Sequence, residues 1–200
     1  MSFFNTSTQC KPATLVTPRL TLRPLREDDA QALFSMWSDV EAMRYFAFSA
    51  MTELEQAAER VAQVMKTVDD GEVFVCTVES RATGEVLGDC SLFHINEQCR
   101  RAEIGYSLLR KHWGHGYMIE ATTALLEHAF DTLNLRRIEA DIDPRNTPSA
   151  RVLERLGFVR EGYLRERWII GDELSDSALY GLLERDYRMR AGTASQALQK

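Results

Sequence analysis

The chain has 200 residues, of which 44% are hydrophobic and 27% are charged, and its formal net charge is −6. This size and composition are typical of one ordinary globular domain that needs no disulfide or metal ion for stability. The acidic balance argues against general nucleic-acid binding, and no apolar run approaches the roughly 18 residues of a membrane span. Neither a nucleic acid nor a membrane is therefore expected as a partner.

The first part of the chain predicts an arm, a strand and a helix, in that order. Residues 1–14 are polar and aperiodic, which favours a flexible N-terminal arm. Residues 19–25, RLTLRPL, alternate as a strand does, and Pro24 indicates an edge or an end of that strand. Residues 27–37 begin with acids and continue with apolar residues at helical spacing, so they predict a helix.

A second amphipathic helix is predicted over 52–68, where Thr52 and Glu55 have the spacing of a capping box. From there to the end, strands and helices are mixed. Strands are predicted over 72–80, 86–95, 101–109, 136–143, 158–170 and 175–183, and helices over 116–133 and 144–158. This mixture predicts an α/β fold with one sheet covered by helices, in a single domain over 15–188 followed by a flexible tail over 189–200.

The four cysteines show no metal or redox spacing; they are Cys10, Cys76, Cys90 and Cys99. No two of them form a C-x-x-C pair, so zinc ribbons and thioredoxin-type motifs are not indicated. The start of the chain lacks the cationic and apolar segments of a signal peptide. We therefore expect a reduced, cytoplasmic setting and no bound metal.

Glycines stand at two places where a side chain would obstruct the backbone. Gly105 lies inside the predicted strand 101–109, where glycine often marks a bulge or a close approach by another group. Gly114 and Gly116 lie in the loop KHWGHG before the next predicted helix. A helix N-terminus presents free N–H groups and partial positive charge, which suits phosphate oxygens, although helix starts also carry glycine for steric reasons alone. The Walker pattern is absent, and a Rossmann fingerprint would need glycine at Ile119.

Basic residues gather around this loop in an otherwise acidic chain. Arg110 and Lys111 precede it, while Arg145, Arg151 and Arg155 lie in or beside the last predicted helix. Arg151 and Arg155 are four residues apart and share one helical face. If the two helices pack side by side, these residues form a basic rim suited to a ligand with several phosphates. The alternative is a solvated helix face paired with neighbouring glutamates.

Four short motifs in sequence order resemble the GNAT superfamily of acetyl-CoA-dependent N-acetyltransferases. They are Glu103-Ile104-Gly105-Tyr106, Lys111-x-x-Gly114-x-Gly116, Asn146-x-x-Ser149 and Leu156-Gly157-Phe158. The opening RLTLRPLREDDA and the closing segment with its Gly171-Asp172 turn resemble the RimJ/RimL-type branch, which acetylates α-amino groups of ribosomal proteins. The resemblance covers residues 15–188. It implies a mixed, mostly antiparallel twisted sheet of about seven strands with splayed central strands, flanked by about four helices.

The resemblance also implies a site for acetyl-CoA, the cosubstrate. Its pantetheine arm would lie between strands 101–109 and 136–143, in a gap that a bulge near Gly105 opens, and its pyrophosphate would lie on the amides of residues 112–117. The implied coenzyme-binding residues are Tyr106, Ser107, Leu108, Leu109, Lys111, His112, Trp113, Gly114, His115, Gly116, Tyr117, Asn146, Ser149, Arg151 and Arg155. We expect His112 and His115 to be solvent-facing members of this anion loop rather than metal ligands.

Transfer of an acetyl group to an amine needs a neutral amine, a donor to the oxyanion and a proton for the leaving thiolate. The resemblance implies Glu103 as the base, acting through a water, and Ser149 as the acid or thiol hydrogen-bond donor. A backbone N–H freed by the bulge near 104–106 would serve the oxyanion. The alternatives are a strand glutamate that faces solvent or pairs with an arginine, and an ordinary serine in the first turn of a helix.

Two positions depart from the family pattern. Leu153 stands where many members carry a tyrosine that protonates the thiolate, so either Ser149 takes this role or no side-chain acid is used. Lys111 stands where glutamine or arginine is usual, which keeps a phosphate contact but not bidentate geometry.

The expected function is acetyl transfer to a primary amine by direct attack in a ternary complex. A peptide or protein N-terminus is the first choice of acceptor. A small amine such as a polyamine, an amino sugar or an amino-acid analogue is the second, and a module that binds CoA without turnover is a third reading. Tyr106, Tyr163 and Trp168 line the acceptor mouth or pack in the core, and His94 either touches the acceptor or is a plain sheet histidine. The resemblance also allows a homodimer.

Overall fold

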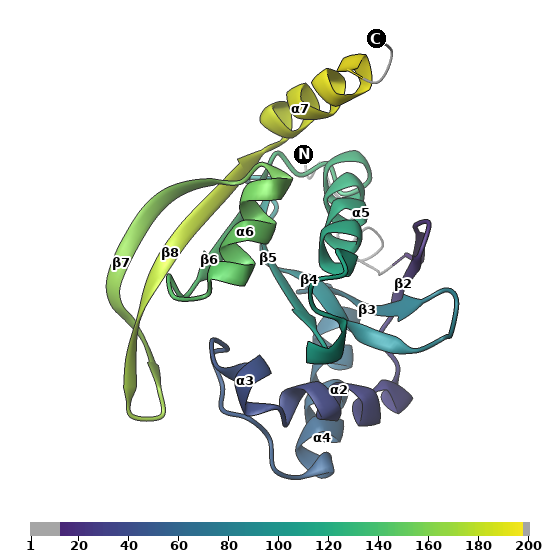
Figure 1. Ribbon diagram of the computed structural model, residues 1–200, viewed down its shortest axis with the longest axis vertical. Helices are drawn as coiled ribbons and strands as arrows, with labels where there is room; N and C mark the ends of the chain where they lie inside the picture. The colour runs from purple at the N-terminus through teal and green to yellow at the C-terminus, as the bar shows by residue number, and fades with distance from the viewer. Residues whose placement is uncertain (1–12, 198–200) are drawn as a thin grey trace.

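The computed structural model describes the backbone of residues 13–197 and the side chains of residues 13–190. Its central element is one eight-stranded sheet in the order β1-β2-β3-β4-β5-β6-β8-β7 (Figure 1). The strands are β1 (Leu15–Val16), β2 (Leu20–Pro24), β3 (Phe74–Ser80), β4 (Val86–Asn96), β5 (Arg101–Leu108), β6 (Arg137–Ile142), β7 (Val159–Ile170) and β8 (Glu173–Leu183). The β5–β6 pair is parallel and the other pairs are antiparallel. The mixed, mostly antiparallel sheet predicted from the sequence is thus confirmed.

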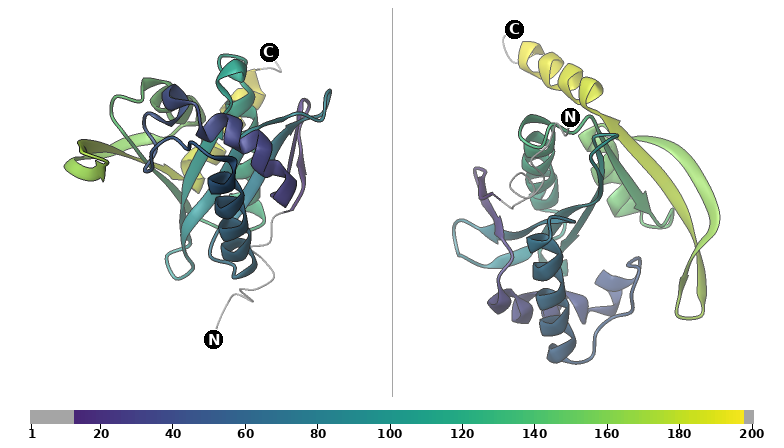
Figure 2. Two further views of the ribbon diagram at one scale, coloured as in Figure 1. Left: turned by 90° about the horizontal axis from the view of Figure 1, so that it is seen from below. Right: turned by 180° about the vertical axis from the view of Figure 1, so that it is seen from behind.

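Helices cover both faces of this sheet (Figure 2). They are η1 (Glu27–Asp29), α2 (Ala30–Trp37), α3 (Val40–Met43), α4 (Leu54–Asp69), η2 (Arg110–His112), α5 (Tyr117–Asp131), α6 (Thr147–Leu156) and α7 (Glu184–Ala197). The helices α5 and α6 pack through Leu125 and Leu153 on one face, in a core that includes Leu92 and Ile138. The helices α2 and α4 form a second cluster on the other face. Within residues 13–197, no helix combines the length and the apolar character needed to cross a bilayer.

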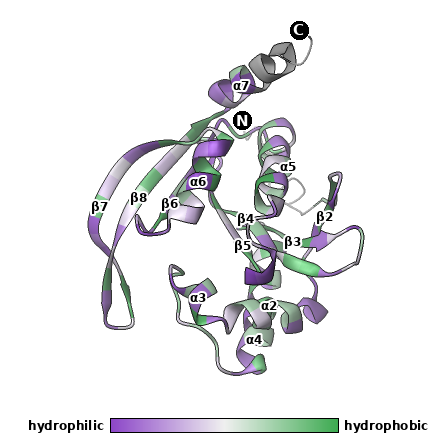
Figure 3. Cartoon of the chain, in the orientation of Figure 1, coloured by the Kyte–Doolittle hydropathy of each residue, from purple (hydrophilic) through white to green (hydrophobic). Residues whose placement is uncertain are grey.

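Strand β3, in the middle of the sheet, shows that both faces of the sheet are covered. In β3, residues 74–78 are all buried, so this strand is covered on both faces of the sheet. Figure 3 shows the hydropathy of the residues along the sheet. Cys76 and Cys90 are register partners on β3 and β4, and both are buried free thiols, whereas Cys99 is exposed. Cys10 lies outside the described residues.

The parallel pair β5–β6 is short, and the two strands then separate. Pairing runs from Arg101 opposite Arg137 to Glu103 opposite Glu139, and the remaining residues of β5 have no ladder partner on β6. We call the opening beyond Glu103 the β5–β6 gap. The splayed central strands predicted from the family resemblance are therefore confirmed.

The predicted bulge near Gly105 is wrong, although the close approach predicted there is present. Gly105 lies in register opposite Ser91, and the register shift lies instead on β4, between Phe93 and Asn96. His94 adopts a positive φ of 49° at this bulge. A Cβ on Gly105 would lie 3.0 Å from the Phe93 ring, so glycine leaves room for that ring. The gap thus results from the divergence of β6 and not from a bulge in β5.

The helix ends differ from the sequence prediction in three places. The N-cap of α4 is Glu53, and Gln56 rather than Glu55 completes the capping box, because the Gln56 amide reaches back to the backbone. The short α3, capped by Asp39, had no periodic signal. Residues 189–197 of the predicted flexible tail belong to α7, in which Glu184 and Arg188 form an i,i+4 pair, and residues 198–200 lie outside the described part of the chain. Of the predicted flexible arm over 1–14, residues 1–12 lie outside the described part of the chain.

Candidate active site

The loop before α5 forms an open backbone cradle. Gly114 and Gly116 have positive φ values of 78° and 76°, a conformation that favours glycine. A Cβ on Gly114 would meet nothing within 4 Å, and one on Gly116 would meet only the Arg19 guanidinium at 3.7 Å. No side chain caps the N-terminus of α5. The turn at residues 114–116 therefore offers both open space and the partial positive charge of a helix N-terminus.

The free amides of this cradle begin later than the sequence predicts. The N–H groups of His112 and Trp113 donate to the carbonyls of Leu109 and Arg110, so they are already used. Among the described residues, the N–H groups of residues 114–119 have no hydrogen-bond acceptor. Six consecutive donors at a helix N-terminus fit the oxygens of a diphosphate.

Arg19 lies beside the cradle, and sequence reasoning missed it. Its Nη1 donates to the carbonyl of His115 at 3.0 Å, and its guanidinium carbon lies 4.5 Å from the centre of the Tyr117 ring. Its Nε also pairs with Glu120 Oε2 at 2.6 Å. Because Arg19 and His115 are 96 residues apart in the chain, no local pattern could have revealed this contact.

Two of the predicted coenzyme residues point elsewhere. Lys111 Nζ lies 2.5 Å from Glu85 Oε1, which directs this side chain toward the start of β4. The indole of Trp113 donates to the carbonyl of Leu108, so it fixes the loop against the end of β5.

His112 does not face solvent as predicted, because its side chain is only 17% exposed and its Nε2 lies 3.3 Å from Glu85 Oε1. The His115 ring stacks on Tyr117, and Leu109 donates its N–H to the Leu87 carbonyl. The helices α5 and α6 lie side by side (Figure 1). On the exposed face of α6, neither Arg151 nor Arg155 has an ion-pair partner among the described residues. This face therefore retains two unneutralised positive charges.

A cavity of about 550 Å³ lies on the other side of the β5–β6 gap. Its roof is apolar and comes from α2, α4 and the segment that joins α3 to α4, with Trp37, Phe46 and Phe48 among its residues. The Arg60 guanidinium carbon lies 4.0 Å from the centre of the Phe48 ring. The floor comes from β4 and β5, and the tip of the β7–β8 hairpin closes one side.

The two predicted catalytic residues both line this cavity. Glu103 is the last residue of β5 that pairs with β6, and its side chain is 22% exposed. Its Oε2 lies 3.0 Å from Nδ1 of His94, which is 71% exposed. Ser149 is buried in the first turn of α6, where Asn146 caps the helix by accepting the Ser149 N–H.

Tyr106 links Ser149 to the edge of the gap. The Tyr106 hydroxyl lies 2.8 Å from Ser149 Oγ and 3.3 Å from the Ser149 carbonyl. Burial raises the pKa of Tyr106 to about 12, against the opposing effect of the Ser149 contact. The phenol is therefore protonated at neutral pH.

Ser107 faces the opposite side of the sheet from Tyr106. Its hydroxyl donates to Asp89, its register partner on β4. Burial raises the pKa of Asp89 to about 6, although the Ser107 hydrogen bond and the charge of Arg60 oppose this. Asp89 and Arg60 both line the cavity, and no sequence motif had pointed to either.

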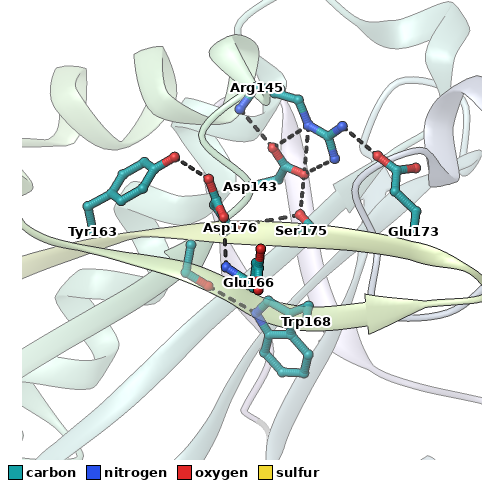
Figure 4. Close-up of polar contacts among 9 residues, drawn as sticks. Asp143, Arg145, Tyr163, Glu166, Trp168, Glu173, Ser175 and Asp176 are labelled. Carbon is teal, nitrogen blue, oxygen red and sulfur yellow. Dashed lines mark hydrogen bonds and ion pairs between the residues drawn. The ribbon is translucent and has the colours of Figure 1, made fainter.

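A polar network holds the loop after β6 against the β7–β8 hairpin (Figure 4). Asp143 accepts hydrogen bonds from Arg145 and from the Ser175 hydroxyl, and Arg145 also donates to Glu173. Burial alone would raise the pKa of Asp143, but these hydrogen bonds lower it to about 2. Arg145 is thus neutralised and does not join the predicted basic rim.

The aromatic residues predicted at the acceptor mouth divide between the cavity and the outside of the hairpin. Trp168 lines the cavity, and its indole donates to Ser177 Oγ at 3.1 Å. Tyr163 donates to Asp176 and is not among the lining residues (Figure 4). Among the described side chains, no group of three or more His, Cys, Asp or Glu residues is placed to hold a metal ion.

Comparisons with known proteins agree with this geometry. Residues 19–159 match the family model described as an acetyltransferase (GNAT) domain. The chain is 38% identical over 174 residues to the uncharacterized N-acetyltransferase p20 of Bacillus licheniformis, covering 87% of this chain and 98% of that one. It is 25% identical over 182 residues to the spermidine N(1)-acetyltransferase of Escherichia coli (strain K12), covering 90% and 94%.

A solved structure of similar shape is described as a putative ribosomal-protein-serine acetyltransferase from Vibrio cholerae, with a TM-score of 0.74, 25% identity and coverage of 86% of this chain and 99% of that one. Enzymes of the matched family use acetyl-CoA as the acetyl donor and an amine as the acceptor. The chain therefore belongs to the GNAT family of acetyltransferases, in its RimJ/RimL-type branch, and is an N-acetyltransferase.

Proposed function

We propose that this protein transfers the acetyl group of acetyl-CoA to the α-amino group of a peptide or protein N-terminus. The observation that carries the donor half of this proposal is the uncapped N-terminus of α5, whose glycine cradle opens beside the β5–β6 gap. The amides of residues 114–119 would hold the diphosphate. Arg151 and Arg155 would add charge on the neighbouring helix.

The β5–β6 gap supports binding of the pantetheine arm. Beyond Glu103, the edge of β5 that faces β6 has no ladder partner, so its backbone groups are available to an extended ligand. A backbone N–H of residues 104–106 on this edge is the proposed donor to the oxyanion. Acetyl-CoA supplies a thioester as the activated acetyl group.

Glu103 is the proposed base. It lies at the start of the gap and lines the cavity, where it can take a proton from the acceptor amine through a water. Its contact with the exposed His94 connects this carboxylate to solvent. Ser149, held by Asn146 and Tyr106, is the proposed donor to the leaving thiolate.

The peptide acceptor rests on three supports: the RimJ/RimL-type branch, the wide wall formed by the hairpin, and a structural neighbour described as a putative ribosomal-protein-serine acetyltransferase. A small cationic amine is the second candidate. It is favoured by the carboxylates that line the cavity, and one relative is a spermidine acetyltransferase.

The test is acetyl-CoA turnover by the purified full-length protein over a panel of N-terminal peptides and small amines. Release of free CoA is followed together with the mass of each acceptor. We expect acetylation at peptide α-amino groups, and Glu103→Gln to lower kcat by about 100-fold with little change in the KM for acetyl-CoA.

Glu97→Gln, an exposed glutamate in the turn between β4 and β5, is the matched control. Turnover restricted to small amines would contradict the peptide acceptor. A kcat for Glu103→Gln equal to that of the control would remove Glu103 as the base.

A further inference from the structure

The cavity is lined by more carboxylate side chains than acetyl transfer requires. Among its described lining residues are four acids, Asp89, Glu103, Asp141 and Asp143, and two cations, Arg60 and Arg167. Three of the four acids have dedicated partners. Asp143 is bound by Arg145 and Ser175, Asp89 is bound by Ser107, and Glu103 contacts His94. Asp141 is the acid left to explain.

The carboxylate of Asp141 is incompletely satisfied. Its side chain is only 10% exposed, yet its Oδ1 is buried with no hydrogen-bond partner among the described residues. Its Oδ2 accepts a single hydrogen bond, from Nε of Arg167 at 3.2 Å. A buried carboxylate oxygen without a partner is costly, so its presence calls for a physical explanation.

Asp141 also stands beside the place of the proposed chemistry. It is two residues beyond Glu139, the residue of β6 that pairs with Glu103. Because side chains alternate along a strand, Asp141 and Glu139 project from the same face, and Glu103 shares this face through the pairing. Asp141 therefore lies on the neighbouring strand, two residues beyond the register partner of the proposed base, and on the same face of the sheet.

Arg167 shows what kind of group this carboxylate accepts. It extends from β7, and its side chain is half exposed, so it is held only on one side. Its guanidinium is a half-exposed cation, so it can move into solvent when another cation replaces it at Asp141. A cationic ligand that enters the cavity can take this place at the carboxylate.

We propose that Asp141 binds a second cationic group of the acceptor, and that the preferred acceptor is therefore an amine that carries another ammonium or guanidinium on a short spacer. This rests on the proposed function and narrows its substrate. Asp141 is assigned to the second group and not to the reacting amine, because Glu103 already serves the reacting amine as the proposed base. A diamine and a peptide with an N-terminal lysine share this chemistry.

The experiment compares acceptors that differ only in the second charge. Putrescine is paired with n-pentylamine, and a peptide that begins with lysine is paired with one that begins with 2-aminoheptanoic acid, in which a methyl group replaces the ammonium. For wild type, kcat/KM for each charged acceptor is expected to exceed that of its uncharged partner by about tenfold or more. Asp141→Asn is expected to remove this preference while leaving the uncharged acceptors and the KM for acetyl-CoA within about twofold.

Two further variants sharpen the test. Asp172→Asn, in the exposed turn of the hairpin, makes the same charge change outside the cavity and should keep the preference. Arg167→Gln removes the competing guanidinium and should raise kcat/KM for the charged acceptors by about threefold. Equal loss on charged and uncharged acceptors in Asp141→Asn, or no preference in wild type, would overturn the proposal.

The two acceptor pairs separate this inference from the function on which it rests. If neither peptide is acetylated but putrescine is preferred through Asp141, the peptide acceptor is wrong and the subsite stands. Calorimetric binding of putrescine in the presence of CoA supplies a readout without turnover. Binding that is equally tight in wild type and in Asp141→Asn would count against the subsite.

Discussion

At the scale of single residues, the contact between Tyr106 and Ser149 is the most informative feature of the site. Because burial keeps the phenol protonated, Tyr106 donates a hydrogen bond to Ser149, either at the carbonyl or at Oγ. A hydroxyl that is held in this way has fewer orientations for its own proton. Tyr106 is therefore a positioning residue for Ser149 in the proposed mechanism.

We expect Tyr106→Phe to lower kcat by about tenfold, with a smaller effect on the KM for acetyl-CoA. Ser149→Ala should have a similar effect, and the double variant should be no slower than the worse single variant, because the two hydroxyls act as one unit. Steady-state kinetics of the four proteins test this. Thioester donors with a more acidic leaving thiol should shrink both defects, and effects that add independently would contradict the pairing.

The proposed role of Asp141 could not be predicted from the sequence. It occupies an ordinary position in a strand that alternates regularly, and no motif marks it. Its role emerges only when the gap, the cavity and the position of Arg167 are known.

At the scale of elements, the strand–turn–helix unit from β5 to α5 carries the proposed acetyl-CoA site. The loop combines two positive-φ glycines with six free amides, and both features lie within residues 114–119. This is why the motif could be identified from the sequence. Its neighbours could not, since Arg19 and Glu85 come from the distant strand β2 region and from the start of β4.

We expect Gly114→Asp to weaken acetyl-CoA binding by about 100-fold or more, because it places a negative side chain at the proposed phosphate site. Gly84 provides a matched control: its φ is 71°, a Cβ there also meets nothing within 4 Å, and it lies in the turn between β3 and β4. Both substitutions place a side chain on a left-handed backbone, which costs about 1 kcal/mol, but only Gly114→Asp lies in the cradle. Titration calorimetry should therefore show near wild-type affinity for Gly84→Asp, and parallel losses would refute the cradle as the diphosphate site.

At the scale of the whole molecule, the half-buried Asp89 links the free energy of unfolding to pH. Its pKa is about 6 in the folded protein and about 3.9 in the unfolded chain, so the folded state binds this proton more tightly. The free energy of unfolding therefore falls as pH rises from about 4 to about 6, and above pH 6 it has lost the full contribution of Asp89.

Asp89→Asn should raise the free energy of unfolding by about 1 to 3 kcal/mol at pH 8 and change it little at pH 4. The amide keeps an oxygen for the Ser107 hydroxyl, so the hydrogen bond survives. Urea denaturation at the two pH values measures the difference. An equal change at both pH values would show that the effect comes from packing and not from the charge.

The comparison between sequence and structure also differs with scale. Periodicity placed nearly every strand and long helix, and Asn146 and Gly157 bound α6 as local capping rules predict. Local rules failed where a distant group decides the outcome. The gap opens because β6 turns toward β8 and not because Gly105 forms a bulge, and Lys111 turns toward Glu85. The proposed acceptor cavity is lined by residues from nine helices and strands, so no single stretch of sequence contains its pattern.

The sheet also separates the two proposed substrate sites in space. The glycine cradle belongs to the layer of α5 and α6, the aromatic roof belongs to the layer of α2 and α4, and the opening beyond Glu103 joins them. In the proposed function each substrate would enter from its own side of the sheet, so both would be bound at the same time and the acetyl group would pass directly to the amine. We therefore expect substitutions in the aromatic roof to change which amine is preferred while the affinity for acetyl-CoA stays the same.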